Sequence, residues 1–389
     1  MVVNFEFLGD EPIENVITCM NFKVDKVVFL GYHDTIMEQK KSTESFLKKY
    51  CDVQSVVFHA LSSHDLQSTL NTMRNAIEYE LSMKNKIYFD ITGGESLILV
   101  AFGMLCDEYD ISMHMYDIID DKLIEFADMK KMSAHVESRK IPLSLELLIS
   151  MRGGTIGRSS HKYIKGCSDE DFLEDARKIY AIASRNWELW NPFSDFLRTK
   201  VILENDTSLV VSRTTKSIAR AISMTKGRLD STTELYDMLD RFAEGGILLD
   251  MHRTKDHIRF RFKSEDVKKC LCDGGAILEI HTWLEERGAS DDCLVGVYLD
   301  WDGVIQQPGV TDVLNEVDVL SLHGNIATFI SCKTGKLGAQ QSLHALYEIE
   351  TVASRFGGRY ARKVLVSAQG LGETYRQRAA EMGIEVWEA

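Results

Sequence analysis

The sequence contains no apolar run long enough to span a membrane. Its most apolar stretch, residues 96–105, is much shorter than the ~20 residues that a membrane-spanning helix needs. Residues 1–9 predict a strand and lack the basic, apolar and small-residue regions of a signal peptide. We therefore expect a cytoplasmic protein that has no contact with a membrane.

Cysteine pairs, an excess of positive charge and nucleotide-binding glycine patterns are also missing. The eight cysteines form no C-x-x-C pair, which argues against a zinc ribbon and against a disulfide framework. Lys and Arg number 45 against 59 Asp and Glu, a net charge of −14, so general electrostatic binding of nucleic acid is disfavoured while local basic patches stay open. Neither G-x-G-x-x-G nor G-x-x-x-x-G-K-[S/T] occurs, which disfavours a nicotinamide-dependent oxidoreductase and a P-loop NTPase.

The length predicts two or three soluble domains, of which the first has the most regular pattern. At about 100–200 residues per domain, 389 residues suffice for two or three cores. The first ~130 residues alternate β-branched runs with amphipathic segments, which is typical of a Rossmann-like parallel sheet covered by helices. The expected strands are residues 2–8, 26–30, 53–59, 86–91 and 111–116, and the expected helices are residues 13–21, 36–50, 64–83 and 96–108.

The middle of the chain, residues 143–272, is predominantly helical and ends in a hairpin pattern. Its clearer helices are residues 169–185, 192–203 and 232–243. The last of these ends at Gly245-Gly246 and precedes two short strands around a polar turn, an order that is similar to a winged helix. Residues 253–263 carry five cations against one anion, which suits contacts to phosphates, and a solvated β-ribbon is the alternative.

The remaining residues, 273–389, show the element order of a third domain. The expected elements are a helix at 275–287, strands at 293–299, 314–322 and 326–333, a helix at 338–356, a strand at 362–367, a helix at 375–382 and a strand at 384–387. This αβββαβ order is the outline of a restriction-endonuclease-like core. Residues 353–378 hold six cations against one anion, which favours a groove for a nucleic-acid backbone, with a solvated face as the alternative.

The run Asp90-Ile91-Thr92-Gly93-Gly94-Glu95-Ser96 marks a candidate ligand site in the first domain. A buried strand is predicted to end here in two glycines, and a helix opens immediately afterwards. Glycines let the backbone approach a ligand closely, and a helix N-terminus offers unpaired N–H groups to an anion or a polar ligand edge. The alternative is a tight strand-to-helix turn that binds nothing.

Two other predicted strands are followed by the loops Gly9-Asp10-Glu11-Pro12 and Gly31-Tyr32-His33. Together with these loops, the Asp90–Gly94 motif resembles the CARF family, the CRISPR-associated Rossmann-like domains. The resemblance covers roughly the first 140 residues. Its candidate ligand-binding residues are Gly9, Asp10, Gly31, Tyr32, His33, Thr92, Gly93, Gly94, Glu95 and Ser96. Glu95-Ser96 stands where many members carry Thr-Lys. The resemblance implies a homodimer that binds a cyclic oligoadenylate across its two-fold axis, with backbone and hydroxyl contacts from the D-x-T-G-G motif.

A second constellation lies in the third domain, with Glu279 on a predicted helix, Asp318 on a strand and Lys333 at the end of the next strand. Phosphodiester hydrolysis needs such groups, because carboxylates hold Mg²⁺ or Mn²⁺ and a lysine supports the nucleophile or the developing charge. The set resembles the PD-(D/E)XK nuclease superfamily, in which these three residues would be catalytic. The alternative is that they are ordinary charged residues on exposed strand faces.

The resemblance implies a metal site made of Glu279, Asp318 and the backbone carbonyl of Cys332. One departure concerns the position two residues before the motif lysine, which is normally acidic and is Ser331 here. Glu316 lies two residues before Asp318 and therefore on the same strand face, so it is a candidate for the missing carboxylate.

The combination of a CARF-like sensor and a nuclease-like domain resembles the CARF nucleases of type III CRISPR systems. We expect an α/β protein with a CARF-like domain at 1–142, a helical, winged-helix-like region at 143–272 and a PD-(D/E)XK nuclease-like domain at 273–389. The resemblance implies a metal-dependent endonuclease activated by cyclic oligoadenylate, most simply cyclic tetra-adenylate. Its substrates would be single-stranded DNA or RNA, with nicking of duplex DNA as a further activity. The alternative is a ligand-gated nucleic-acid-binding regulator whose nuclease-like domain has lost catalysis.

Overall fold

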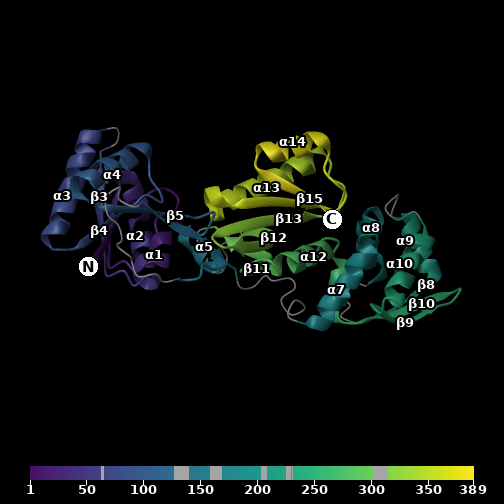
Figure 1. Cartoon of the computed structure of the whole chain (residues 1–389). Helices are drawn as coiled ribbons and strands as arrows, with labels where there is room; N and C mark the ends of the chain where they lie inside the picture. Colours follow the sequence, from purple (N-terminus) through teal and green to yellow (C-terminus); the bar gives the residue numbers. More distant parts are fainter. Residues whose placement is uncertain are drawn as a thin grey trace, which may run out of the picture.

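A computed structural model describes residues 1–62, 65–126, 140–157, 169–202, 208–224, 229, 231–301 and 314–389. The N-terminal domain lies at one end of the molecule, the C-terminal sheet occupies the centre, and the middle region of the chain lies at the opposite end (Figure 1). No helix within the described ranges is long and apolar enough to cross a membrane.

The N-terminal domain is a six-stranded sheet with the order β3-β2-β1-β4-β5-β6. Its strands are β1 (Val2–Phe7), β2 (Lys26–Tyr32), β3 (Ser55–Leu61), β4 (Lys86–Asp90), β5 (Ser112–Asp117) and β6 (Lys122–Phe126). The first five strands run parallel, as the sequence predicts, and β6 adds an antiparallel edge that the sequence analysis missed. Strand β2 is buried along almost its whole length, as is typical of a parallel strand covered on both faces.

Helices cover both faces of this sheet. They are α1 (Ile17–Asn21), α2 (His33–Tyr50), α3 (Leu66–Ser82) and α4 (Ser96–Tyr109). Helices α3 and α4 pack on Phe5 and Phe89 from one face, whereas α1 and α2 pack on Val27 and Phe29 from the other. All four helices therefore connect parallel strands, which brings the carboxyl ends of β1, β2 and β4 to one edge of the sheet.

The middle region combines helices with a small sheet, an arrangement similar to the winged helix that the sequence predicts. Its elements are α7 (Glu170–Ala183), α8 (Trp187–Phe196), a π-helical turn (Leu197–Val201), β8 (Val210–Thr214), α9 (Thr215–Met224), α10 (Thr232–Glu244), β9 (Leu248–Arg253), β10 (His257–Phe262) and α11 (Glu265–Cys272). Strands β8, β10 and β9 form an antiparallel sheet in that order. Helix α10 begins after Ser231, whose hydroxyl accepts from the Glu234 amide, and it ends before Gly246, which adopts φ +72°. The hairpin and α10 agree with the sequence prediction, and β8 and α9 are additions to it.

The C-terminal domain is built on a second six-stranded sheet with the order β15-β14-β13-β12-β11-β7. Its elements are α12 (Ala276–Arg287), β11 (Asp292–Asp300), β12 (Leu314–His323), β13 (Ile326–Lys333), α13 (Ala339–Phe356), a 3-10 helix (Gly358–Tyr360), β14 (Arg362–Ser367), α14 (Glu373–Glu381) and β15 (Ile384–Glu388). The edge strand β7 (Thr155–Ile156) and the helix α5 (Leu145–Met151) come from the segment that the sequence analysis placed in the middle region.

Successive residues of β13 show how the helices cover this sheet. Phe329 packs in the cluster that contains α5 and α13, whereas Ile330 packs in the cluster that contains α12 and the helices of the middle region. Because neighbouring strand residues point to opposite faces, α12 and α13 lie on opposite sides of the sheet. The predicted αβββαβ order agrees with the structure, and the middle region shares a hydrophobic core with the α12 face of the sheet.

Candidate functional site

A cavity of about 300 Å³ opens at the carboxyl ends of β1 and β2 and at the loop after β4. Its lining residues are Phe7, Leu8, Gly9, Asp10, Glu11, Glu14, Tyr32, Thr35, Gly94, Glu95 and Arg359. Five of the residues that the sequence proposed for ligand binding are in this set: Gly9, Asp10, Tyr32, Gly94 and Glu95. The cavity lies where ligands bind in open α/β sheets, outside the carboxyl ends of the strands. We call it the sensor pocket.

Tyr32 and Glu95 join two walls of the sensor pocket. The Tyr32 hydroxyl donates to Glu95 Oε2 at 2.7 Å, which links the end of β2 to the residue that precedes α4. Burial, together with this carboxylate, raises the pKa of Tyr32 to about 12, so the hydroxyl stays protonated and remains a donor. The Tyr32 ring also packs edge-on against Phe7, with ring centroids 5.6 Å apart. The pocket thus offers aromatic surface beside polar groups.

Thr92 makes its contacts inside the domain and is absent from the pocket lining. Its hydroxyl donates to Asp90 Oδ1 at 2.5 Å and accepts from the Tyr116 amide at 2.8 Å. Burial opposes ionisation of Asp90, but hydrogen bonds and the charge of His114 outweigh it, and the pKa of Asp90 is lowered. Asp90 is 1% exposed, so the first half of the D-x-T-G-G motif forms a buried anchor below the pocket.

The two glycines of the motif let neighbouring side chains approach the backbone closely. A Cβ at Gly93 would lie 2.7 Å from Glu14 Oε2, and Gly94 adopts φ +142°, which other residues rarely do. Gly31 also lies outside the lining, where a Cβ would approach Leu8 to 3.1 Å. The two remaining candidates, His33 and Ser96, are the first residues of α2 and α4 and do not line the pocket.

Four lining residues with polar side chains were not among the candidates from the sequence: Glu11, Glu14, Thr35 and Arg359. The two glutamates follow Gly9 and Asp10 in the same loop, so a wider reading of that loop would have found them. Arg359 belongs to the C-terminal domain, and no local pattern connects it with the first strand.

In the C-terminal domain, Asp318 on β12 lies beside the end of β13. Asp318 Oδ2 accepts from the Cys332 amide at 2.6 Å and from the Ser331 hydroxyl at 3.1 Å, and it lies 3.7 Å from Lys333 Nζ. The antiparallel pairing of the two strands produces this cluster, because Val319 pairs with Ile330 and the next positions outward are Asp318 and Ser331. The structure thus brings together the predicted carboxylate, the predicted lysine and the serine that replaces the usual acidic residue.

Glu279 lies on α12, where it is 6% exposed. Thr282, one turn further on, places its hydroxyl 3.6 Å from Cys332 Sγ, so this face of α12 lies against β13. Burial raises the pKa of the Cys332 thiol well above its usual value, and the charges of Asp318 and Glu279 raise it further. Both effects favour the neutral form of the thiol.

The oxygen donors around Asp318 suit a hard divalent cation. Glu316 and Asp318 line a small cavity of about 20 Å³ together with Ser331 and, from α13, Glu348. Glu348 was not predicted from the sequence. Within the described part of the chain, no three His, Cys, Asp or Glu side chains are grouped so that they could hold a metal ion. Asp318, Glu279 and the Cys332 carbonyl would supply oxygen donors, the kind that Mg²⁺ and Mn²⁺ prefer.

The cations of the basic stretch 353–378, where the sequence predicts a groove for a nucleic-acid backbone, have acceptors within the chain. Each of its six cations is bound by an acceptor of the chain itself: Arg355 by the Arg152 and Trp301 carbonyls, Arg359 by Glu14, Arg362 by Glu385, Lys363 by Glu350, Arg376 by Glu388 and Arg378 by Glu381. In the hairpin, Arg253, Arg261 and Lys263 pair with Asp240, Asp250 and Asp175. Local carboxylates thus neutralise charge that the linear sequence presents as a patch.

Comparison with known proteins places these observations in context. Residues 266–387 match the family model of the Card1-like endonuclease domain. The whole chain is similar in structure to protein VC1899 from Vibrio cholerae, with a TM-score of 0.72, 17% identity, and coverage of 100% of this chain and 94% of that one. It is also similar to Can2 from Sulfobacillus thermosulfidooxidans in complex with cyclic tetra-adenylate, with a TM-score of 0.63, 14% identity, and coverage of 99% and 92%.

A third structure, a type III CRISPR defence DNA nuclease activated by cyclic oligoadenylate, matches with a TM-score of 0.47 and 14% identity, over 94% of this chain and 45% of that one. No curated protein sequence matches the chain. The family match and the likeness in fold confirm the resemblance to CARF-domain nucleases that the sequence indicated.

Proposed function

We propose that the protein is a nuclease of type III CRISPR defence that cyclic tetra-adenylate activates. The observation that carries this proposal is the cluster of Asp318, Ser331, Cys332 and Lys333 within the segment that matches the Card1-like endonuclease domain. A Rossmann-like domain with a polar pocket at its strand ends lies on the same chain. The likeness in fold to Can2 extends across both parts.

The residues around Asp318 have distinct roles in the proposed reaction. Asp318, Glu279 and the Cys332 carbonyl would hold Mg²⁺ or Mn²⁺, with Glu316 as a further carboxylate; the bound ion would polarise the scissile phosphate and activate a water. The Cys332 amide and the Ser331 hydroxyl fix Asp318 Oδ2 in place. Lys333, whose side chain is 31% exposed, presents its ammonium group to the negative charge that develops on the phosphate.

The proposed active unit is a homodimer that packs through α4. Leu99, Val100 and Met104 are 37%, 53% and 48% exposed on this helix, although side chains of this kind are usually buried. A Cβ at Gly103 meets nothing within 4 Å, so the same face is open. Because α4 begins beside the sensor pocket, packing of two copies along it would place two pockets near one two-fold axis, as a symmetric ring requires.

The proposed substrates are single-stranded DNA and RNA, with nicking of duplex DNA as a further activity. The test incubates the purified protein with supercoiled plasmid and with labelled single-stranded DNA or RNA, in Mg²⁺ or Mn²⁺, with and without cyclic tetra-adenylate or cyclic hexa-adenylate. The Lys333→Ala variant is the control, since it should bind ligand and cut nothing. Cutting that needs both metal and one ligand supports the proposal, and cutting by Lys333→Ala would refute the site assignment.

A second candidate function is favoured by the winged helix. A groove of about 550 Å³ between α9, α10 and the hairpin is lined by Lys216, Tyr236 and Lys255 among others, which suits a nucleic-acid backbone. Together with Ser331 at the usual acidic position, this groove favours a ligand-gated regulator that binds nucleic acid and does not cut it. Sequence-dependent DNA binding without divalent ions, combined with the absence of cutting in every condition above, would favour the regulator.

A further inference from the structure

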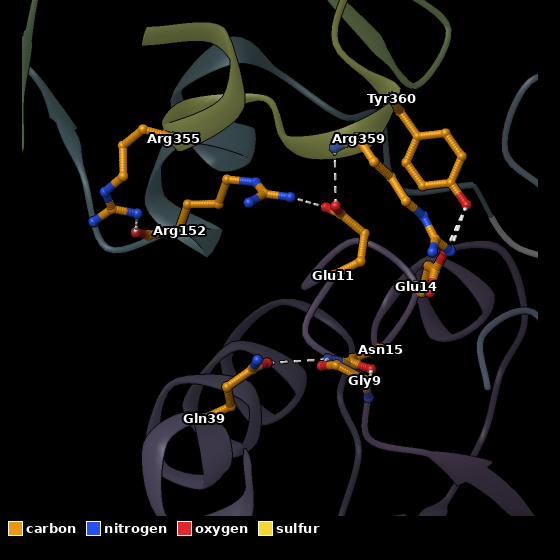
Figure 2. A network of polar contacts seen from close by, with 9 residues as sticks. All are labelled: Gly9, Glu11, Glu14, Asn15, Gln39, Arg152, Arg355, Arg359 and Tyr360. Atoms are coloured by element: carbon orange, nitrogen blue, oxygen red, sulfur yellow. Dashed lines mark hydrogen bonds and ion pairs between the residues drawn. The ribbon is translucent and has the colours of Figure 1, made fainter. Parts of the chain in front are cut away.

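One wall of the sensor pocket comes from the nuclease domain. Arg359 lies in the 3-10 helix Gly358–Tyr360, directly after α13, and its guanidinium pairs with Glu14 at the pocket (Figure 2). The other ionisable groups of the described lining are Tyr32 and four carboxylates, those of Asp10, Glu11, Glu14 and Glu95, so Arg359 is its one cation. The Arg359 side chain is 61% exposed whereas that of Glu14 is 4% exposed, which leaves the guanidinium accessible from the pocket.

The loop after β1 is tied to the nuclease domain at two glutamates. Glu11 accepts from the Arg152 guanidinium and, at 3.2 Å, from the Arg359 amide, whereas Glu14 accepts from the Tyr360 hydroxyl as well as from the Arg359 side chain. Figure 2 shows these groups facing one another across the junction of the two domains. The sensor therefore contacts the nuclease domain through the same loop that lines the pocket.

Local hydrogen bonds make this loop a stiff connection. The Gly9 amide donates to Asn15 Oδ1 at 3.0 Å, and Asn15 Nδ2 donates to the Gly9 carbonyl at 2.9 Å and to Gln39 Oε1 at 3.2 Å. These bonds join both ends of the loop to each other and to α2. Glu14 therefore lies within a segment that is held at both of its ends.

We propose that Arg359 is a ligand-binding residue of the sensor pocket and that a phosphate of the ligand takes its guanidinium from Glu14. The inference rests on the proposed function only in that the ligand is a cyclic oligoadenylate, which carries one negative charge per phosphate. The four carboxylates of the described lining repel such a ligand, so Arg359 is the charged group of this lining that attracts a phosphate. Arginine binds phosphate oxygens in a bidentate manner, and Glu14 keeps the Tyr360 hydroxyl as a donor when Arg359 leaves.

The same exchange connects ligand binding with the nuclease cluster. Helix α13 ends at Phe356, two residues before the 3-10 helix that carries Arg359, and its residues Glu348, Ile349 and Val352 line the small cavity beside Asp318 and Ser331. One continuous helix therefore joins the Arg359 segment to the proposed catalytic cluster. In the proposed exchange, the Arg359–Glu14 pair is present without ligand and absent when ligand is bound. The ligand therefore favours one of two arrangements of α13, and such a preference is what a population shift requires.

The test compares three full-length variants with the wild type. Arg359→Ala removes the proposed contact, and Arg362→Ala is the matched control, because Arg362 lies three residues further on and pairs with Glu385 outside the pocket. Glu14→Gln removes the competing charge and keeps an acceptor for Tyr360. Affinity for cyclic tetra-adenylate and cyclic hexa-adenylate is measured by calorimetry, and cutting is measured at saturating ligand.

We expect Arg359→Ala to weaken ligand binding at least tenfold and to lower cutting even at saturation, Arg362→Ala to behave as wild type, and Glu14→Gln to bind several-fold more tightly. Equal affinity of Arg359→Ala and wild type would overturn the inference. Weaker binding with full cutting at saturation would overturn the coupling through α13. If Arg359→Ala does not fold, Glu14→Gln still decides, since unchanged or weaker binding contradicts the exchange. A wild type that binds neither ring would instead refute the proposed function, and this inference with it.

Discussion

Replacing Thr92 with valine tests whether the D-x-T-G-G motif supports the sensor from within. Valine keeps the shape of threonine and leaves no cavity, so only the hydroxyl is lost. That hydroxyl donates to the buried Asp90 carboxylate at 2.5 Å and accepts from the Tyr116 amide at 2.8 Å. The substitution therefore removes one charge-assisted hydrogen bond, leaves one strand amide without its acceptor and removes a weaker contact, at 3.3 Å, with the Thr18 hydroxyl.

The magnitude follows from these two bonds. A hydrogen bond to a charged group contributes about 1.5–3 kcal/mol, and an unsatisfied buried donor costs about 1–3 kcal/mol. Thr92 is half-buried, which places the sum toward the lower end, at roughly 3 kcal/mol. Since about 1.4 kcal/mol is a factor of ten, the sheet should open ~100-fold more often.

Hydrogen exchange of the full-length protein, followed by mass spectrometry of peptides from β4 and β5, measures this change locally. The control is Thr35→Val, because the Thr35 hydroxyl is exposed and lies 3.5 Å from Asp10 Oδ1. It should change exchange by less than about threefold, in line with the ~0.5 kcal/mol typical of surface substitutions. Unchanged exchange in Thr92→Val, together with a large loss of ligand affinity, would refute the reasoning and make the hydroxyl a direct ligand contact.

Three further predictions concern the other parts of the molecule. Asp318→Asn should lower cutting by about 10²–10³-fold, the usual loss when a charge-stabilising group is removed, with unchanged ligand affinity; cutting at wild-type rates would reject the cluster. Met104→Glu should convert the proposed dimer to a monomer in analytical ultracentrifugation, whereas Met83→Glu, at a residue that is 60% exposed after α3, should not; a dimer in both would exclude the α4 face. Burial, followed by the charge of Asp90, raises the pKa of Glu6, so the folded state holds a proton that the unfolded state releases. The stability of the N-terminal domain should therefore fall as pH rises above 4.5, the usual pKa of glutamate, and Glu6→Gln should flatten that fall in thermal unfolding. A wild type whose stability does not fall over this pH range would contradict the raised pKa of Glu6.

Much of the fold was predictable from local patterns. Residues 26–30 and 86–91 form buried strands. Their β-branched and aromatic side chains leave neither face of the strand mainly polar, so helices are needed on both faces of the sheet. Turn residues between the runs marked the connections, so the parallel order and the αβββαβ order followed. Strands β6 and β8 were missed, and β8 has only two apolar residues, Val210 and Val211.

The two motifs were also visible in the sequence, since each lies at the end of one strand. Asp318 and Lys333 could be assigned to adjacent strands because one short turn joins β12 to β13. What the motifs do not contain is the set of partners around them. Glu348 reaches the Asp318 cavity from a helix, and Thr92 proved to be engaged inside the sheet, neither of which a strand pattern encodes.

The sequence by itself determined the class of each domain and the location of both candidate sites, because period, turns and strand ends are local properties. Only the tertiary structure decided which charges meet. It showed that the cations of 353–378 are bound by the chain's own acceptors, and that Arg359 lies at the sensor pocket, 348 positions from Glu11 in the chain. Contacts between residues so far apart in the sequence depend on how two folded domains pack against each other, and no residue spacing along the chain specifies that packing.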